Sequence, residues 1–154
     1  MDGKFYPVTF GHQQSVTIPA GEPAISDGIH CYVKAQSTFD VSFYLKDYTQ
    51  MRSVVFTSGP LSYGSYALGD LTEVAHFPMD QARTTHYFYF LSNVSVYTSE
   101  KIRTVVCYGD SISAQDWPDY LTLRCQKEGY DNTAIIRRAT SGSRILREYS
   151  CITY

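Results

Sequence analysis

From residue 105 the chain reads Val105-Val106-Cys107-Tyr108-Gly109-Asp110-Ser111-Ile112. The first four residues are apolar or aromatic, which favours a buried strand. The Gly-Asp-Ser that follows is typical of a tight turn, because glycine and aspartate tolerate backbone conformations that other residues avoid. We therefore expect Ser111 to lie at the carboxyl end of a buried strand, in front of a helix.

The segment after this turn is predicted to complete a βαβ unit. Asp116 can cap a helix whose first turn contains Pro118, where the missing N–H group costs nothing. Gly129 would end the helix as a C′ glycine. The helix carries an apolar stripe that would lie on the sheet, formed by Trp117, Tyr120, Leu121 and Cys125. Residues 133–139 predict a second strand, which a right-handed crossover makes parallel to the strand at residues 103–108.

This arrangement would bring two serine-containing loops together. In a parallel βαβ unit, the loops that follow both strands emerge at the same edge of the sheet. The hydroxyl of Ser111 could attack a carbonyl carbon, and the N–H groups of Ser111 and Gly142 could bind the oxygen that becomes negative. Glycine suits residue 142 because no Cβ would obstruct the approach of the backbone. The simpler alternative is a tight connection with a capping serine.

At these residues the chain resembles the SGNH or GDSL hydrolase superfamily. The first motif block of that superfamily is similar to Gly109-Asp110-Ser111-Ile112, and the second to Ala139-Thr140-Ser141-Gly142-Ser143-Arg144-Ile145-Leu146. Residues 7–100 resemble the N-terminal β-domain of some bacterial members of its esterase or lipase-like branch. The resemblance implies a carboxylic ester hydrolase that needs no cofactor or metal, with Ser111 as nucleophile and oxyanion N–H donor and Gly142 as the second donor. Its substrate would be a small ester, with acylated carbohydrates as one class.

Two other blocks of the superfamily have no counterpart in these residues. They are the Gly-x-Asn-Asp block, whose asparagine completes the oxyanion hole, and the Asp-x-x-His block, which supplies the carboxylate and the base. All four histidines precede Ser111, namely His12, His30, His76 and His86. Of the functional residues of the superfamily, only the nucleophile and one oxyanion donor therefore have counterparts here, at Ser111 and Gly142. Asp110 matches the motif but is interpreted as a residue that stabilises the turn. We expect a truncated hydrolase that is inactive alone.

Before residue 100, short alternating segments separated by turn signals predict an antiparallel, jelly-roll-like β-sandwich. The expected strands are residues 8–10, 15–18, 29–34, 40–45, 53–57, 71–75 and 85–96. Residues 35–39 should close a hairpin between the third and fourth of these strands. The predicted fold class is α+β. It combines this sandwich, as a domain over residues 1–100, with the first βαβ unit of a flavodoxin-like three-layer α/β/α hydrolase domain over residues 101–154.

Composition narrows the choice of partners. The net charge of −2 provides no basic field for nucleic acid. The four cysteines lack C-x-x-C spacing and are interpreted as free thiols. No run approaches about 18 apolar residues, so no membrane span is expected. Without a leader in the sequence, we expect a cytoplasmic protein, or a secreted one if a signal precedes these residues.

Two further expectations concern association and function. In a flavodoxin-like sheet the strand at residues 103–108 is internal, yet no third strand follows in this sequence. Its exposed edge should therefore cause self-association, through edge pairing or exchange of the βαβ segment. The alternative to a hydrolase is a non-catalytic module that binds carbohydrate or a protein partner and carries a vestigial hydrolase motif.

Overall fold

The computed structural model describes residues 4–50 and 55–144. The chain divides into two compact units, the first made of Met1–Tyr44 and Gly69–Phe77 and the second of Leu45–Leu68 and Pro78–Tyr154. The three points at which the chain passes between these units all fall before residue 78, so none of them coincides with the domain boundary expected near residue 100. That boundary stays a prediction. All of the helices and strands described below belong to the second unit.

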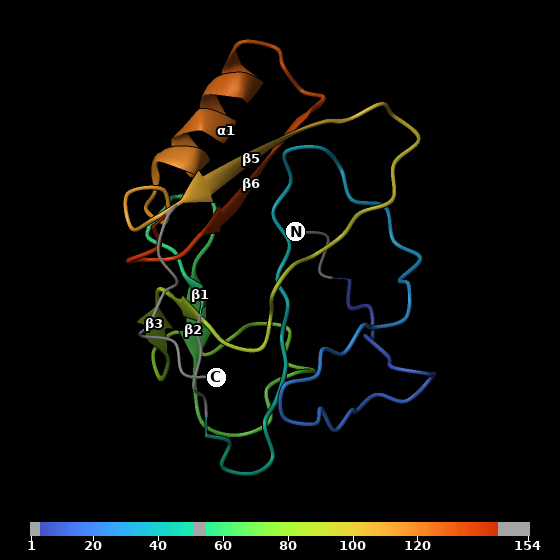
Figure 1. Ribbon diagram of the computed structural model, residues 1–154. Helices are drawn as coiled ribbons and strands as arrows, with labels where there is room; N and C mark the ends of the chain where they lie inside the picture. Colours follow the sequence, from blue (N-terminus) through green and yellow to red (C-terminus); the bar gives the residue numbers. More distant parts are fainter. Residues whose placement is uncertain (1–3, 51–54, 145–154) are drawn as a thin grey trace. The chain divides into compact units, whose positions relative to one another are not determined.

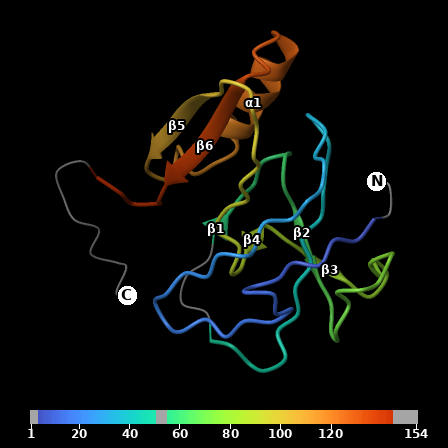
Figure 2. The same ribbon diagram turned by 90° about the vertical axis from the view of Figure 1, so that its right-hand side faces the viewer.

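The most regular part of the structure is a βαβ unit. It consists of β5 (Arg103–Gly109), α1 (Trp117–Lys127) and β6 (Thr133–Ala139). The strands pair in parallel along their whole length, from Arg103 opposite Thr133 to Gly109 opposite Ala139. α1 lies along one face of this pair and packs against β6 (Figures 1 and 2). The strand, helix and parallel strand expected from the sequence are therefore confirmed.

The ends of α1 also follow the sequence signals. Asp116 occupies the N-cap position, although its side chain makes no capping hydrogen bond. At the other end Gly129 has a φ of +81°, in the left-handed region that favours glycine. The N–H of Gly129 donates to the carbonyl of Gln126 at 3.2 Å, and the N–H of Tyr130 donates to that of Cys125 at 2.8 Å. These two bonds form a Schellman motif, which pairs carbonyls that the end of a helix would leave free.

The apolar stripe of α1 does not lie wholly on the sheet as expected. Leu121 and Cys125 are half-buried, whereas Tyr120 is 57% exposed. A two-stranded sheet is narrower than a helix with its side chains, so it cannot cover a stripe of this width. Trp117 instead covers the preceding turn, because its indole Nε1–H donates to the carbonyl of Ile112 at 3.0 Å.

Two small antiparallel ladders precede this unit. β1 (Val55–Phe56) pairs with β4 (Tyr87–Phe88), and β2 (Gly64–Tyr66) pairs with β3 (Arg83–Thr85). The described residues thus contain three two-stranded sheets. No jelly-roll sandwich is seen among them, and the fold class expected for the whole chain stays a prediction.

Several expected strands do not form. Residues 8–10, 15–18, 29–34, 40–45 and 71–75 lie outside the strands of the structure. In the expected hairpin the turn is present, since the N–H of Ser37 donates to the carbonyl of Lys34 at 3.1 Å, but no ladder follows it. Alternation specifies which side chains share a face, whereas a strand also needs a partner for its backbone groups. These segments do not join a ladder with any of the described strands.

Burial is concentrated in one place of the second unit. The four buried positions of the described chain are Thr57, Gly59, Cys107 and Pro118. They come from the loop after β1, from β5 and from the first turn of α1. The loop after β1 is therefore part of the packing of the βαβ unit, although the sequence places about forty residues between them.

Candidate functional site

The turn that carries Ser111 is fixed by its own backbone and by one carboxylate. Oδ1 of Asp110 accepts the N–H of Ile112 at 3.0 Å, which is an Asx turn. The carbonyl of Asp110 accepts the N–H of Ala114 at 2.9 Å. The interpretation of Asp110 as a turn residue is confirmed. α1 begins at Trp117, so further turns separate Ser111 from the helix.

Residue 109 lies in close contact with the Ser113 side chain. A Cβ at this position would lie 2.5 Å from Oγ of Ser113 and 3.0 Å from its Cβ, closer than side-chain atoms pack. A side chain at residue 109 would therefore force the Ser113 side chain to shift. The contact with Ser113 therefore favours glycine at residue 109 independently of its place in the Gly-Asp-Ser motif.

The loop after β6 meets the end of β5 at the same edge. The N–H of Thr140 donates to the carbonyl of Gly109 at 3.0 Å, which extends the parallel ladder into the loop. The N–H of Ser143 then donates to the carbonyl of Thr140 at 3.1 Å, and Gly142 has a φ of +81°. This is the left-handed conformation that a type II turn requires at its third residue. The expectation that the two serine-containing loops leave one edge is confirmed, whereas convergence of their N–H groups on one cavity stays a prediction.

Ser111 itself is exposed, and no described residue hydrogen-bonds its hydroxyl group. The histidine of the same compact unit, His86, packs instead against Phe56, with ring centroids 6.4 Å apart. The described part of this unit therefore contains a candidate nucleophile without a hydrogen-bonded base. A serine in this state is a weak nucleophile, because activation requires a neighbouring base.

Sequence reasoning missed Arg137, which organises the surroundings of the turn. Its Nη1 donates to the carbonyl of Ala114 at 3.3 Å and to that of Gln115. Its Nη2 donates to Oγ1 of Thr57 at 2.8 Å and lies 3.9 Å from a carboxylate oxygen of Asp119. One guanidinium thus links β6, the turn after Ser111, the start of α1 and the loop after β1.

Asp119 completes this connection. Its Oδ2 accepts the N–H of Leu61 at 3.2 Å. Gly59 lies so close that a Cβ at residue 59 would overlap the Asp119 carboxylate. We call Thr57, Gly59, Leu61, Asp119 and Arg137 the arginine cluster. It joins the loop at residues 57–62 to the βαβ unit, and its members come from three separate parts of the sequence.

Cys107 is the buried thiol beside this cluster. It is 6% exposed and lies opposite Arg137 in the parallel ladder. Burial raises the pKa of the Cys107 thiol, although the positive charge of Arg137 acts in the opposite direction. The thiol therefore stays protonated at neutral pH and does not compete with Ser111 as a nucleophile.

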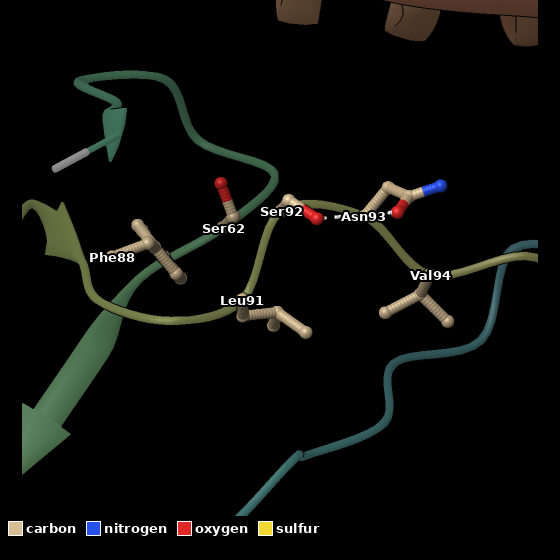
Figure 3. Close-up of a pocket in the computed structure, with 6 residues that line it drawn as sticks. All are labelled: Ser62, Phe88, Leu91, Ser92, Asn93 and Val94. Carbon is tan, nitrogen blue, oxygen red and sulfur yellow. Dashed lines mark hydrogen bonds between the residues drawn. The ribbon is translucent and has the colours of Figure 1, made fainter. Parts of the chain in front are cut away.

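A shallow pocket of about 300 Å³ lies elsewhere in the second unit (Figure 3). Its lining consists of Ser62, Phe88, Leu91, Ser92, Asn93 and Val94. The hydroxyl of Ser92 donates to Oδ1 of Asn93 at 3.4 Å, so part of its polar lining is already paired. None of these side chains is an acid or a base, so the pocket offers surface for binding and no group for catalysis.

Residues 4–50 and 55–144 contain neither a candidate metal site nor a candidate membrane-spanning helix. No group of three or more His, Cys, Asp or Glu side chains is arranged there to hold a metal ion. In the same residues no helix has the length and apolar character needed to cross a membrane. Comparisons with models of protein families, with curated proteins and with solved structures found no match.

Proposed function

We propose that this chain is part of a serine carboxylic-ester hydrolase of the SGNH or GDSL type, and that it carries the nucleophile and two N–H donors of the oxyanion hole. The observation that supports it is the bond between the Thr140 N–H and the Gly109 carbonyl, at the edge from which both serine-containing loops leave. Strand, Gly-Asp-Ser turn, helix, parallel strand and Ser-Gly turn follow one another in the order that this chemistry needs. The proposed substrates are small carboxylic esters, including acylated carbohydrates.

In the proposed reaction, Oγ of Ser111 attacks the ester carbonyl carbon while a histidine from outside these 154 residues takes its proton. The carbonyl oxygen becomes negative and accepts hydrogen bonds from the N–H groups of Ser111 and Gly142. One such donor contributes about 3–4 kcal/mol to transition-state stabilisation in another hydrolase. The C–O bond to the alcohol then breaks, and the alkoxide takes the proton from the imidazolium. Water attacks the acyl-serine in a second, equivalent step and releases the acid.

The test uses the complete product of the gene that encodes this chain. We expect its sequence to contain an Asp-x-x-His block after Ser111. A fluorophosphonate probe should label the protein, and Ser111→Ala should abolish both labelling and hydrolysis of p-nitrophenyl acetate. Ser113→Ala is the matched control, because Ser113 lies in the same turn, and it should retain labelling.

Two results would overturn the proposal. One is labelling of the Ser111→Ala protein at the level of the unmodified protein. The other is a complete gene product without the Asp-x-x-His block, which would favour a binding module with a vestigial motif.

The proposal also includes self-association of the chain. Among the described strands β5 pairs with β6 alone, so one edge of β5 has no ladder partner there. An edge of this kind pairs readily with another strand.

A further inference from the structure

The backbone groups of β5 point alternately to its two edges. The N–H of Arg103 donates to the carbonyl of Asn132 at 2.8 Å, and the carbonyl of Gly109 accepts the N–H of Thr140 at 3.0 Å. In a parallel ladder the residues that bond one neighbour alternate with residues that face away from it. The N–H and C=O groups of Thr104, Val106 and Tyr108 therefore face the other edge of β5.

This other edge is open among the described residues. β5 belongs to a two-stranded sheet whose second strand is β6. The side chains next to the open edge are also accessible, since Val106 is 53% and Tyr108 83% exposed. A two-stranded sheet needs a helix or further strands to be stable in water, and α1 covers only one face of β5 and β6. The unit would therefore be stabilised by further strands at this edge.

We propose that the open edge binds β5 of a second copy of the chain, antiparallel, about a two-fold axis at Val106. Val106 then lies opposite Val106 of the second copy, and Thr104 lies opposite Tyr108. Each of these pairs exchanges both of its N–H···O=C bonds, because all three residues turn these groups outward. The result is a four-stranded sheet in the order β6-β5-β5-β6, with both copies of α1 on the same face. This inference deepens the self-association proposed above for the 154-residue chain, and it does not depend on the proposed ester hydrolysis.

The pairing register follows from the length of β5. A shift by two residues in one direction would place Tyr108 opposite Ile102, and a shift in the other direction would place Thr104 opposite Asp110. Both Ile102 and Asp110 lie outside β5. Only the register centred on Val106 pairs every outward-facing residue of the strand with another.

Charge favours a second copy in antiparallel orientation. β5 begins with a basic residue, Arg103, and a second one, Lys101, lies two residues before it, while an acidic residue, Asp110, directly follows its end. Antiparallel pairing brings the basic end of each copy beside the acidic turn of the other. Parallel pairing of two copies in register would instead place Arg103 beside Arg103, which is unfavourable.

The test is a disulfide across the proposed axis. In a hydrogen-bonded antiparallel pair the Cα atoms lie about 5.5 Å apart, a separation that suits a disulfide. Mild oxidation of the Val106→Cys protein should therefore give a covalent dimer on a non-reducing gel. Ile136→Cys is the matched control, because Ile136 is 39% exposed on the same face but lies on β6, away from the axis. The unmodified chain gives the background from its own cysteines.

Light scattering on the unmodified chain provides a second, independent measurement. We expect the mass of a dimer at high protein concentration, together with a cross-link in Val106→Cys well above that in Ile136→Cys. A monomeric mass at every concentration would overturn the proposal. Equal cross-linking of the two cysteine variants would also overturn it, because contact would then occur between sheet faces. Circular dichroism at the helical minimum confirms that both variants remain folded.

Discussion

At the scale of single residues, Ser111 is the proposed nucleophile, and no base is bonded to its hydroxyl group among the described residues. We predict that the 154-residue chain hydrolyses p-nitrophenyl acetate no faster than its Ser111→Ala variant. Loss of one member of a catalytic triad lowers turnover by about 10⁴–10⁶ in a serine hydrolase, even when the oxyanion hole is intact. Turnover by the unmodified chain clearly above that of Ser111→Ala would contradict this prediction.

Asp27 allows a pH-dependent prediction in the first unit. Its carboxylate accepts the Thr9 hydroxyl at 2.6 Å and the N–H groups of His12 at 2.8 Å and Gly11 at 3.1 Å. The Thr9 hydrogen bond, followed by that of His12, lowers the pKa of Asp27 below its ordinary value. A lowered pKa means that the folded state holds this proton less tightly. Its stabilising effect is present above the ordinary pKa and is lost as pH falls through the lowered one.

We predict that Thr9→Val raises the pKa of Asp27 towards the ordinary aspartate value, as measured by an NMR titration of the carboxyl carbon. Thr49→Val is the control, because the Thr49 hydroxyl donates to the carbonyl of Asp47 and not to Asp27. The explanation fails if Asp27 titrates at the same pH in the Thr9→Val and unmodified proteins.

At the scale of elements, the arginine cluster attaches the loop at residues 57–62 to the βαβ unit. We predict that Arg137→Met lowers the free energy of unfolding by about 1.5–3 kcal/mol, because it removes charge-assisted hydrogen bonds to partly buried acceptors. Urea denaturation measures this loss. Arg138→Met should change stability by less than about 0.5 kcal/mol, since Arg138 is exposed on the other face of β6. Equal losses in the two variants would show that the cluster does not stabilise the unit.

The end of α1 gives a second prediction at this scale. Gly129 has a φ of +81°, which costs a residue with a Cβ about 1–2 kcal/mol. We predict that Gly129→Ala lowers the free energy of unfolding by about this amount, as measured by urea denaturation. Gly28→Ala is the control, because a Cβ at residue 28 would meet no atom within 4 Å and the position has no left-handed φ. A Gly129→Ala protein as stable as Gly28→Ala would contradict the Schellman geometry.

The elements that sequence reasoning predicted are those specified by adjacent residues. For α1, the N-cap position, the proline in the first turn and the C′ glycine all lie within fifteen residues of one another. The two strands around it pair with each other. Apolar and polar residues also alternate in residues 29–34 and 40–45. Alternation does not determine which segment a strand pairs with, and no ladder forms there. The side chains of Tyr32 and Phe43 in these segments are 89% and 51% exposed.

In the candidate site too, the residues specified by their neighbours in the sequence could be predicted and those that depend on distant partners could not. Ser111, Asp110 and Gly142 could be placed from local turn chemistry and from the order of the strands. Arg137 could not, because its hydroxyl acceptor, Thr57, lies 80 residues earlier in the chain. One local signal was available, since Arg137 shares a strand face with Ile135, next to the helix. A charged residue on a covered face needs partners, but the sequence does not say where they are.

At the scale of the whole molecule, an interface between copies makes stability depend on protein concentration. We predict that the melting temperature of the unmodified chain rises by about 2 °C for each tenfold increase in concentration, because dimer formation stabilises only the folded state. Val106→Pro should remove this dependence, since proline has no N–H to donate across the open edge of β5. Scanning calorimetry over a dilution series measures both proteins. If the melting temperature of the unmodified chain stays constant on dilution, two copies do not pair through β5. The open edge of β5 would then be available to a different strand.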